Sequence, residues 1–254
     1  MWMPTQVDLT CKLPFPQADL QDITVLYTEE YKMSIAIAID GPAGAGKSSL
    51  SKAVAKELSF IYVDTGALYR TIGLSASRKG LKKDDTQQII NMLKDIEVSL
   101  AFNDEGTQIV LLNGEDVSSL IRTPEASMFA SSVSAIPEVR AFLLDLQRSM
   151  AEKDNVIMDG RDIGTVVLPN AKIKIFLTAS PETRAMRRYK ENMEKGIDCN
   201  YEDVLKDVNE RDYADSHRAI APLKPAEDSI LVDTSEYDFE GSKNLLLKVI
   251  KENM

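Results

Sequence analysis

In IAIAIDGPAGAGKSS, residues 35–49, an apolar run leads directly into a glycine-rich loop with one lysine. The pattern G-x-x-x-x-G-K-[ST] is met by Gly41, Gly46, Lys47 and Ser48. This pattern has meaning only when a strand precedes it and a helix follows it. The apolar run before the loop and apolar residues at spacings of three and four after it supply both. The stretch therefore predicts a strand, a phosphate-binding loop and a helix.

In a loop of this kind, successive backbone amides surround a phosphate, and the following helix contributes the positive end of its dipole. Lys47 can bind the outer phosphates, and the Ser48 hydroxyl can ligate magnesium. We expect a nucleoside triphosphate with Mg²⁺ here. The candidate residues are Gly41, Pro42, Ala43, Gly44, Ala45, Gly46, Lys47, Ser48 and Ser49. The loop does not identify the phosphoryl acceptor, because GTPases, motor ATPases and kinases share it.

The composition is that of an ordinary globular protein, with 254 residues, 44% of them apolar and 28% charged. This length suits one large domain or a domain with an insertion. No apolar run approaches the roughly 18 residues of a membrane span, and no cleavable signal is visible, so we expect a cytoplasmic protein. A net charge of -10 argues against polymeric nucleic acid as a partner. Cys11 and Cys199 are far apart and are expected to be reduced thiols.

From Met33 onward, short apolar runs alternate with helical patterns, which is typical of a parallel sheet covered on both faces. The predicted strands are 35–40, 60–64, 156–160, 172–179 and 229–235. The predicted helices are about 50–58, 66–79, 84–95, 124–152 with a break at Pro137, 181–195, 201–213 and 238–252.

Two segments depart from this alternation. Residues 97–117 show period-two patterning with turns at NDEG and NGED, which predicts a small antiparallel meander inserted into the α/β core. Residues 1–32 contain three prolines and no clear period. They are either a loosely attached extension or not native, with translation starting at Met33, and the second interpretation is favoured because such domains usually open with their first strand.

Polar side chains follow two of the predicted strands, at the edge where open α/β sheets bind ligands. They are Asp64, Thr65 and Arg70 in DTGALYR, and Asp159, Arg161 and Asp162 in DGRD. Such groups suit one phosphate of a second substrate, and Asp159 can support magnesium through water. The alternative is a surface ion pair between the arginine and its flanking carboxylates.

More arginines occur on two late helical segments of this acidic chain. They are Arg184, Arg187 and Arg188 in ETRAMRR, and Arg211 and Arg218, with Asp215, in ERDYADSHR. A spacing of four places Arg184 with Arg188, and Arg211 with Asp215, on one helix face. The alternative is an exposed helix with surface salt bridges. The number of arginines favours a clamp for the charge of a transferring phosphate.

The chain has one histidine, His217, which we expect at the surface or the edge of the pocket. Phosphoryl transfer to another phosphate needs no strong base, because that acceptor is already an anion at neutral pH. The scarcity of histidine therefore does not argue against this chemistry.

Seven stretches in order resemble the bacterial cytidylate kinases of the nucleoside-monophosphate (NMP) kinase family, over about residues 34–250. They are GPAGAGKSS, DTGALYR, ASSVSAIPEVR, DGRDIGTVVLP, ASPETRAMRR, ERDYADSHRAIAPLKPA and LVDTS. The resemblance implies a P-loop NMP-kinase fold with a five-stranded parallel sheet flanked by helices. Within residues 33–254 it implies a core of about 34–80 and 150–252, an NMP-binding insertion of about 81–130 that contains the meander, and a short lid of about 184–200.

The resemblance also implies an activity: in-line transfer of the ATP γ-phosphoryl group to CMP or dCMP, with Mg²⁺. We expect the protein to be a monomer. Its implied catalytic residues are Lys47, Arg161, Arg184 and Arg188. Its implied CMP contacts are Arg70, Arg161 and Arg211 for the phosphate, Ser131, Arg140 and Asp162 for cytosine, and Thr65, Asp215 and Arg218 for sugar and phosphate, with Asp64 beside them. Two features depart from the family: Ser48 and Ser49 stand where many relatives have Gly-Thr or Ser-Thr, and residues 1–32 have no counterpart.

Cytosine differs from uracil by an exocyclic amino donor, which the Asp162 carboxylate or the Ser131 hydroxyl can accept. Uracil would present a carbonyl to these acceptors, and an unpaired buried polar group costs about 1–3 kcal/mol. Two alternatives stay open. One is another P-loop kinase, acting on UMP or shikimate, and the other is a regulatory module that binds nucleotide and hydrolyses it slowly.

Overall fold

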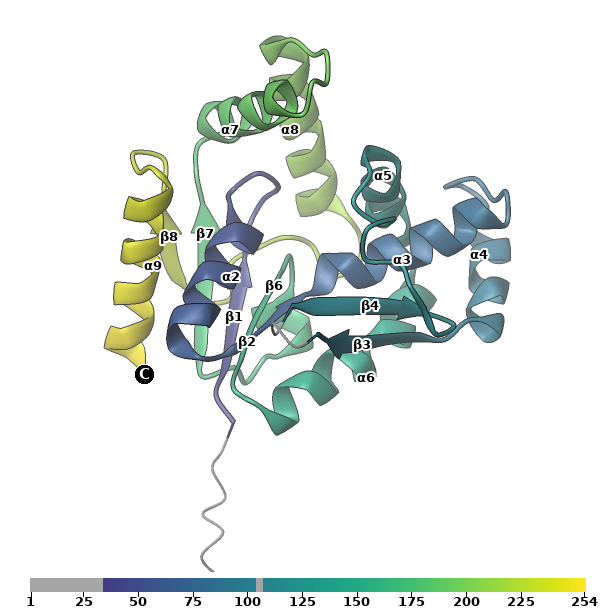
Figure 1. Cartoon of the computed structure of the whole chain (residues 1–254), viewed down its shortest axis with the longest axis horizontal. Helices are drawn as coiled ribbons and strands as arrows, with labels where there is room; N and C mark the ends of the chain where they lie inside the picture. Colours follow the sequence, from purple (N-terminus) through teal and green to yellow (C-terminus); the bar gives the residue numbers. More distant parts are fainter. Residues whose placement is uncertain (1–33, 104–106) are drawn as a thin grey trace, which may run out of the picture. The chain divides into compact units, whose positions relative to one another are not determined.

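The computed structural model of the chain describes residues 34–103 and 107–254 (Figure 1). The predicted extension 1–32 and Cys11 lie outside the described residues. Residues Ser34–Met254 form one compact unit. Within the described ranges, no helix has the length and hydropathy to cross a membrane.

A five-stranded parallel sheet forms the centre of this unit, in the order β2-β6-β1-β7-β8. Its strands are β1 (Ala36–Asp40), β2 (Ile61–Asp64), β6 (Val156–Gly160), β7 (Ile173–Thr178) and β8 (Ile230–Asp233). Every neighbouring pair is parallel. All five predicted strands are confirmed to within about two residues. Because the strands are parallel, their carboxyl ends meet at one edge, which is where the polar residues DTG and DGRD lie.

Helices cover both faces of this sheet because its strands are apolar on both sides. Ile37 and Ile39 of β1 share an apolar cluster with residues of α2 and α9, whereas Ala38 belongs to a cluster on the other face with Ala151 of α6. The long helices around this sheet, not all of which cover its faces, are α2 (Lys47–Leu58), α3 (Thr65–Arg78), α6 (Pro137–Lys153), α7 (Pro181–Glu194), α8 (Tyr201–His217) and α9 (Phe239–Asn253). Figure 1 shows α7 and α8 beyond the carboxyl ends of β1 and β7.

The predicted break at Pro137 is confirmed, and it separates α5 (Pro124–Val133) from α6. Ile136 has extended backbone angles, φ −86° and ψ 120°, because a residue before proline is disfavoured in the helical region. The last long helix before β8 extends further than predicted: α8 ends at His217 and not near residue 213.

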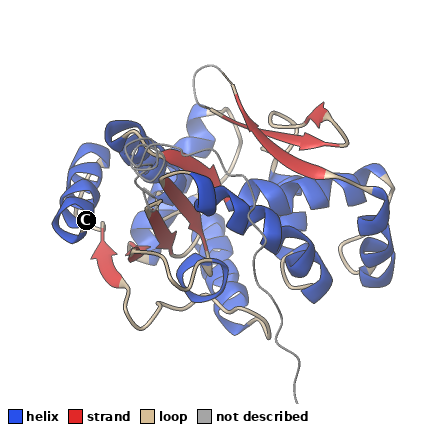
Figure 2. Cartoon of the chain, turned by 90° about the horizontal axis from the view of Figure 1, so that it is seen from below, coloured by secondary structure: helices blue, strands red, loops and turns tan. Residues whose placement is uncertain are grey.

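The predicted meander is a separate three-stranded antiparallel sheet of β3 (Val98–Phe102), β4 (Gln108–Leu112) and β5 (Glu115–Asp116), as Figure 2 shows. Helix α4 (Thr86–Met92) and a 3₁₀ turn, Leu93–Asp95, precede it. Its β4–β5 turn is Asn113–Gly114, with φ of 51° and 81°, the left-handed conformation that tight hairpins need. We call α4, the turn, this sheet and α5 the insertion.

Among the described residues, the insertion shares its apolar cluster with two helices outside it. Its apolar cluster combines Val110 and Leu112 of β4 with Leu68 of α3 and with Val139 and Leu143 of α6. The insertion is therefore packed on two helices that begin or end beside the main sheet.

Candidate active site

The glycine-rich loop between β1 and α2 has a backbone that other residues do not easily adopt. Gly41 has a φ of 150°, and a Cβ there would lie 1.9 Å from the Leu177 carbonyl oxygen. Gly46 is the N-cap of α2 in a left-handed conformation, with φ 85°, and it supplies no side-chain cap. The first amides of α2 are left for another acceptor, and a phosphate is the usual one.

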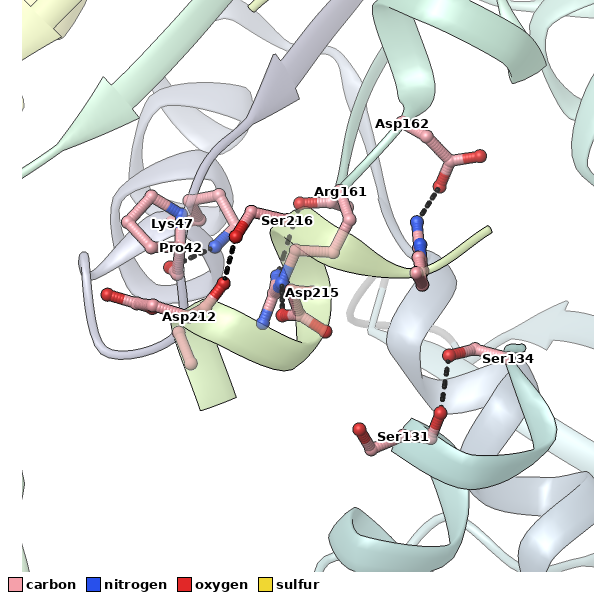
Figure 3. Close-up of polar contacts among 12 residues, drawn as sticks. Pro42, Lys47, Ser131, Ser134, Arg161, Asp162, Asp212, Asp215 and Ser216 are labelled. Atoms are coloured by element: carbon pink, nitrogen blue, oxygen red, sulfur yellow. Dashed lines mark hydrogen bonds and ion pairs between the residues drawn. The ribbon is translucent and has the colours of Figure 1, made fainter. Parts of the chain in front are cut away.

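Lys47, the first residue of α2, is buried, with 6% of its surface exposed. Its Nζ donates a hydrogen bond to the Pro42 carbonyl at 2.7 Å, across the loop (Figure 3). Burial lowers the pKa of Lys47 below its ordinary value, and the positive charge of Arg161 lowers it further. The ammonium group is thus held against the loop in a position where a phosphate would stabilise its charge.

Ser48 and Asp159 connect the loop to the end of β6. The Ser48 hydroxyl donates to Asp159 Oδ2 at 2.9 Å, and the Tyr62 hydroxyl donates to Asp159 Oδ1 at 2.9 Å. Burial raises the pKa of Asp159 to about 6. A hydroxyl beside a carboxylate is an oxygen donor set that suits Mg²⁺, which is held in such sites by one or two protein ligands together with water and phosphate. Sequence reasoning missed Tyr62.

The residues after β2 form a cluster of hydrogen-bonded polar side chains at the start of α3. Asp64 is the N-cap of α3: its Oδ1 accepts from the Ala67 amide at 3.0 Å, and its Oδ2 accepts from Arg70 Nη2 at 2.7 Å. The Thr65 hydroxyl donates to the Asp159 carbonyl at 2.8 Å. Arg70 Nε is buried and has no hydrogen-bond partner among the described residues. One donor of this arginine is therefore still available to a ligand.

Four arginines from four parts of the chain come together at this edge of the sheet: Arg70 of α3, Arg161 after β6, Arg188 of α7 and Arg211 of α8. Burial lowers the pKa of Arg211 to about 10, and the positive charges of Arg161, Arg188 and Arg70 lower it further, against the effect of Asp215. Arg211 Nε, like Arg70 Nε, is buried without a hydrogen-bond partner in the part of the chain that the structure describes. Cations this close, with unused donors, have the chemistry that binds an anion such as phosphate.

Asp215 is the carboxylate within this cluster, and its partner is not the one that helical spacing favours. Arg161 Nε donates to Asp215 Oδ2 at 2.8 Å, whereas no ion pair joins Asp215 to Arg211 among the described residues. In the view of Figure 3, the Arg161–Asp215 pair lies between Lys47 and Asp162. The pair thus links the end of β6 to α8.

Arg184 and Arg188, predicted to act together, have different surroundings. Arg184 is 3% exposed, and its guanidinium donates to the Ala179 carbonyl at 2.8 Å, the Ala43 carbonyl at 3.0 Å and Asp212 Oδ2 at 2.5 Å. Arg188 is exposed. In this structure Arg184 therefore fastens α7 to the glycine-rich loop and to α8, and only Arg188 of the two presents a free surface.

Asp162 lies among arginines at the other end of the site. It forms ion pairs with Arg140 of α6 and, at 3.4 Å, with Arg218, which follows α8. Asp162 and Arg140 are both buried, at 5% and 9% exposure. Ser131 lies on α5, where its carbonyl accepts from the Ser134 hydroxyl at 2.9 Å (Figure 3). The predicted cytosine-contact residues thus include a buried, fixed carboxylate.

Asp40, the last residue of β1, is a site residue that sequence reasoning missed. Its two carboxylate oxygens accept hydrogen bonds from the Ile163 and Gly164 amides, both at 2.7 Å. These amides directly follow Arg161 and Asp162, so Asp40 fixes the segment that carries both side chains. Burial raises the pKa of Asp40 to about 6. The available signal was an acidic residue at the end of a fully buried strand.

The raised pKa of Asp40 predicts a pH-dependent stability difference for Asp40→Asn. The folded protein binds this proton more tightly than the unfolded chain, so the contribution of Asp40 to stability is present at low pH and is lost as the pH rises through about 6. The free energy of unfolding of the wild type should therefore fall relative to that of the variant by about 1 kcal/mol between pH 5 and pH 8. Urea titrations at each pH, with the exposed Asp145→Asn as control, measure this, and parallel curves would contradict it.

Two residues from the sequence analysis remain, His217 and Cys199. His217 is exposed and stacks on Tyr213 with ring centroids 4.0 Å apart, as expected of a surface residue. Cys199 is a free thiol.

A parallel five-stranded sheet with a glycine-rich loop after its central strand defines the P-loop class of nucleotide-binding proteins. The chain belongs to the cytidylate kinase family, which it matches over residues 37–252. It is 50% identical over 214 residues to the cytidylate kinase of Carboxydothermus hydrogenoformans, covering 84% of this chain and 96% of that protein. It is 48% identical over 217 residues to the cytidylate kinase of Streptococcus mutans, covering 85% and 96%. The resemblance found in the seven motifs is confirmed.

Proposed function

We propose that this chain transfers the terminal phosphoryl group of ATP to CMP and dCMP by direct in-line displacement. It acts as a monomer on free nucleotides, and its net charge of -10 supports free nucleotides over polymeric nucleic acid as partners. One observation carries the proposal: among the described residues, the buried Nε atoms of Arg70 and Arg211 have no hydrogen-bond partner, and the charge of Arg161 acts on both Arg211 and Lys47 of the glycine-rich loop. The site therefore has two places for phosphate, and one of them is made of arginines.

On the ATP side, the amides of the loop and of the first turn of α2 bind the phosphates, and Lys47 neutralises charge on the outer ones. Ser48 and Asp159 would hold Mg²⁺, directly and through water. When bound, the ion neutralises charge on the phosphates. The Tyr62 hydroxyl keeps the Asp159 carboxylate in place. Arg184 holds the loop against α7 while the site closes around the nucleotide.

On the CMP side, Arg70, Arg161 and Arg211 bind the phosphate that accepts the transferred group. Guanidinium groups suit this task because their planar donors match phosphate oxygens and stay charged. Arg188, on the exposed face of α7, adds charge during transfer when the lid at about 184–200 closes. The acceptor needs no strong base, since its phosphate is already ionised.

The base is recognised at the Asp162 end of the site. Arg140 and Arg218 fix the Asp162 carboxylate, which accepts a hydrogen bond from the amino group of cytosine, and the Ser131 hydroxyl assists from α5. Thr65, Asp215 and Arg218 lie beside the sugar. UMP would place a carbonyl oxygen against Asp162, leaving a buried acceptor unpaired.

A substrate panel tests the proposal. ATP consumption should be measured with CMP, dCMP, UMP, AMP and shikimate, and CMP and dCMP should exceed the others in kcat/KM by at least about 10-fold. Equal values for UMP would defeat the cytosine argument, and preference for shikimate would assign a different acceptor. ATP turnover that ignores CMP would indicate a nucleotide-binding regulatory module instead of a CMP kinase.

A further inference from the structure

Gln108, the first residue of β4, makes a two-point contact with the main chain of Asp64. The Asp64 amide donates to Gln108 Oε1 at 2.8 Å, and Gln108 Nε2 donates to the Asp64 carbonyl at 3.3 Å. The two residues are 44 positions apart, and the contact connects the insertion to the end of β2.

The contact satisfies backbone groups that the main sheet leaves open. Among the strands that the structure describes, β2 lies at the edge of its sheet and pairs with β6 alone. Both backbone groups of one strand residue point to the same side, so those of Asp64 face away from β6 and would otherwise need water. A carboxamide offers one acceptor and two donors, and it can replace the missing strand at this single residue. No other side-chain hydrogen bond joins the two sheets within the described ranges.

The other contacts of the insertion do not fix its position at this point. Leu100 of β3 packs against apolar clusters on both sides, but apolar contact is non-directional and permits sliding. Arg78 and Glu115 form a bidentate ion pair, with distances of 2.6 and 2.8 Å, but it is exposed and lies at the far end of α3 from Asp64. The Gln108 amide pair is therefore the directional link between the two sheets at the near end of α3.

Asp64 is also the residue that prepares the proposed phosphate site. Its carboxylate caps α3 and holds Arg70, so a displacement of its backbone moves both. We propose that Gln108 is a positioning residue that fixes the insertion to the CMP-phosphate end of the site and so favours CMP binding. This inference rests on the proposed function, because it assigns Arg70 to the phosphate of CMP.

Gln108→Leu tests the inference, because leucine keeps a similar volume and removes both hydrogen bonds. The variant should raise KM for CMP by about 5- to 10-fold, as expected from the loss of two neutral hydrogen bonds, while KM for ATP stays within about twofold. In the absence of nucleotide, amide hydrogen exchange measured by NMR should show the Asp64 amide exchanging about 10-fold faster. Gln87→Leu on α4 is the matched control, since Gln87 is exposed on the same insertion.

Several results of this experiment would contradict the role proposed for Gln108. Unchanged exchange at Asp64 would show that the contact is absent in solution, and faster exchange with an unchanged KM for CMP would show that it does not serve binding. A rise in both KM values, or an equal effect of Gln87→Leu, would indicate a general loss of structure. Each of these results overturns the inference. A wild-type protein that fails to phosphorylate CMP would instead remove the proposed function, whatever the exchange of Asp64 shows.

Discussion

Replacing Lys47 by alanine should lower kcat by about 10²- to 10³-fold and leave KM for CMP within about threefold. The ammonium group lies beside the glycine-rich loop, where charge develops on the transferring phosphate, and loss of one preorganised donor of this kind costs about 3–4 kcal/mol of transition-state stabilisation. In the proposed assignment the arginines, and not Lys47, bind CMP, so the apparent affinity for CMP should change little. Steady-state kinetics with ATP and CMP varied separately give both constants.

The expected loss of kcat in Lys47→Ala should not come from unfolding of the variant. Lys47 is 6% exposed, and burial lowers its pKa, so its charge is costly to the folded state in the absence of nucleotide. Lys47→Ala should therefore match or exceed the wild type in thermal stability, which calorimetry measures. Lys52→Ala, an exposed position on the same helix, is the control and should change neither constant. If Lys47→Ala retained kcat and raised only KM for CMP, the glycine-rich loop would be the CMP end of the site and the arginines the ATP end, contrary to our proposal.

The sequence was sufficient for the sheet and for the glycine-rich loop, because both depend on local pattern. Alternating apolar runs located all five strands, and the proline rule located the break before Pro137. The motif located Lys47 because its spacing is fixed by the loop. Asp64 and Asp159 could be predicted to lie close together, because parallel strands end at a common edge of the sheet.

The connections among these groups could not be predicted, because they depend on the order of strands in the sheet. Asp40 binds amides 123 and 124 positions away, which are close only because β6 lies beside β1. Local spacing favoured Arg211 as the partner of Asp215, but tertiary structure brings Arg161 to that carboxylate. A helix register indicates which residues share a face, and it does not indicate what lies opposite that face.

Replacing Asp162 by alanine should raise KM for CMP by about 10²-fold and bring the ratio of kcat/KM for CMP and UMP close to one. The change removes the proposed acceptor for the cytosine amino group, and it leaves Arg140 and Arg218 without their shared carboxylate. Removal of one partner from a buried pair costs about 3–5 kcal/mol, so this variant should also unfold at a lower temperature. KM for ATP, which we propose binds at the other end of the site, should stay within about threefold.

Asp162→Asn separates recognition from this loss of stability. Asparagine keeps the size of the side chain and one acceptor oxygen, but its amide group can also donate to the carbonyl of uracil. It should retain more stability than Asp162→Ala and should still lower the preference for CMP over UMP. Asp145→Ala, at an exposed position of α6, should leave both substrates unaffected. A variant at Asp162 that lost kcat equally for CMP and UMP, with KM for both unchanged, would place this carboxylate at the reacting phosphates and not at the base.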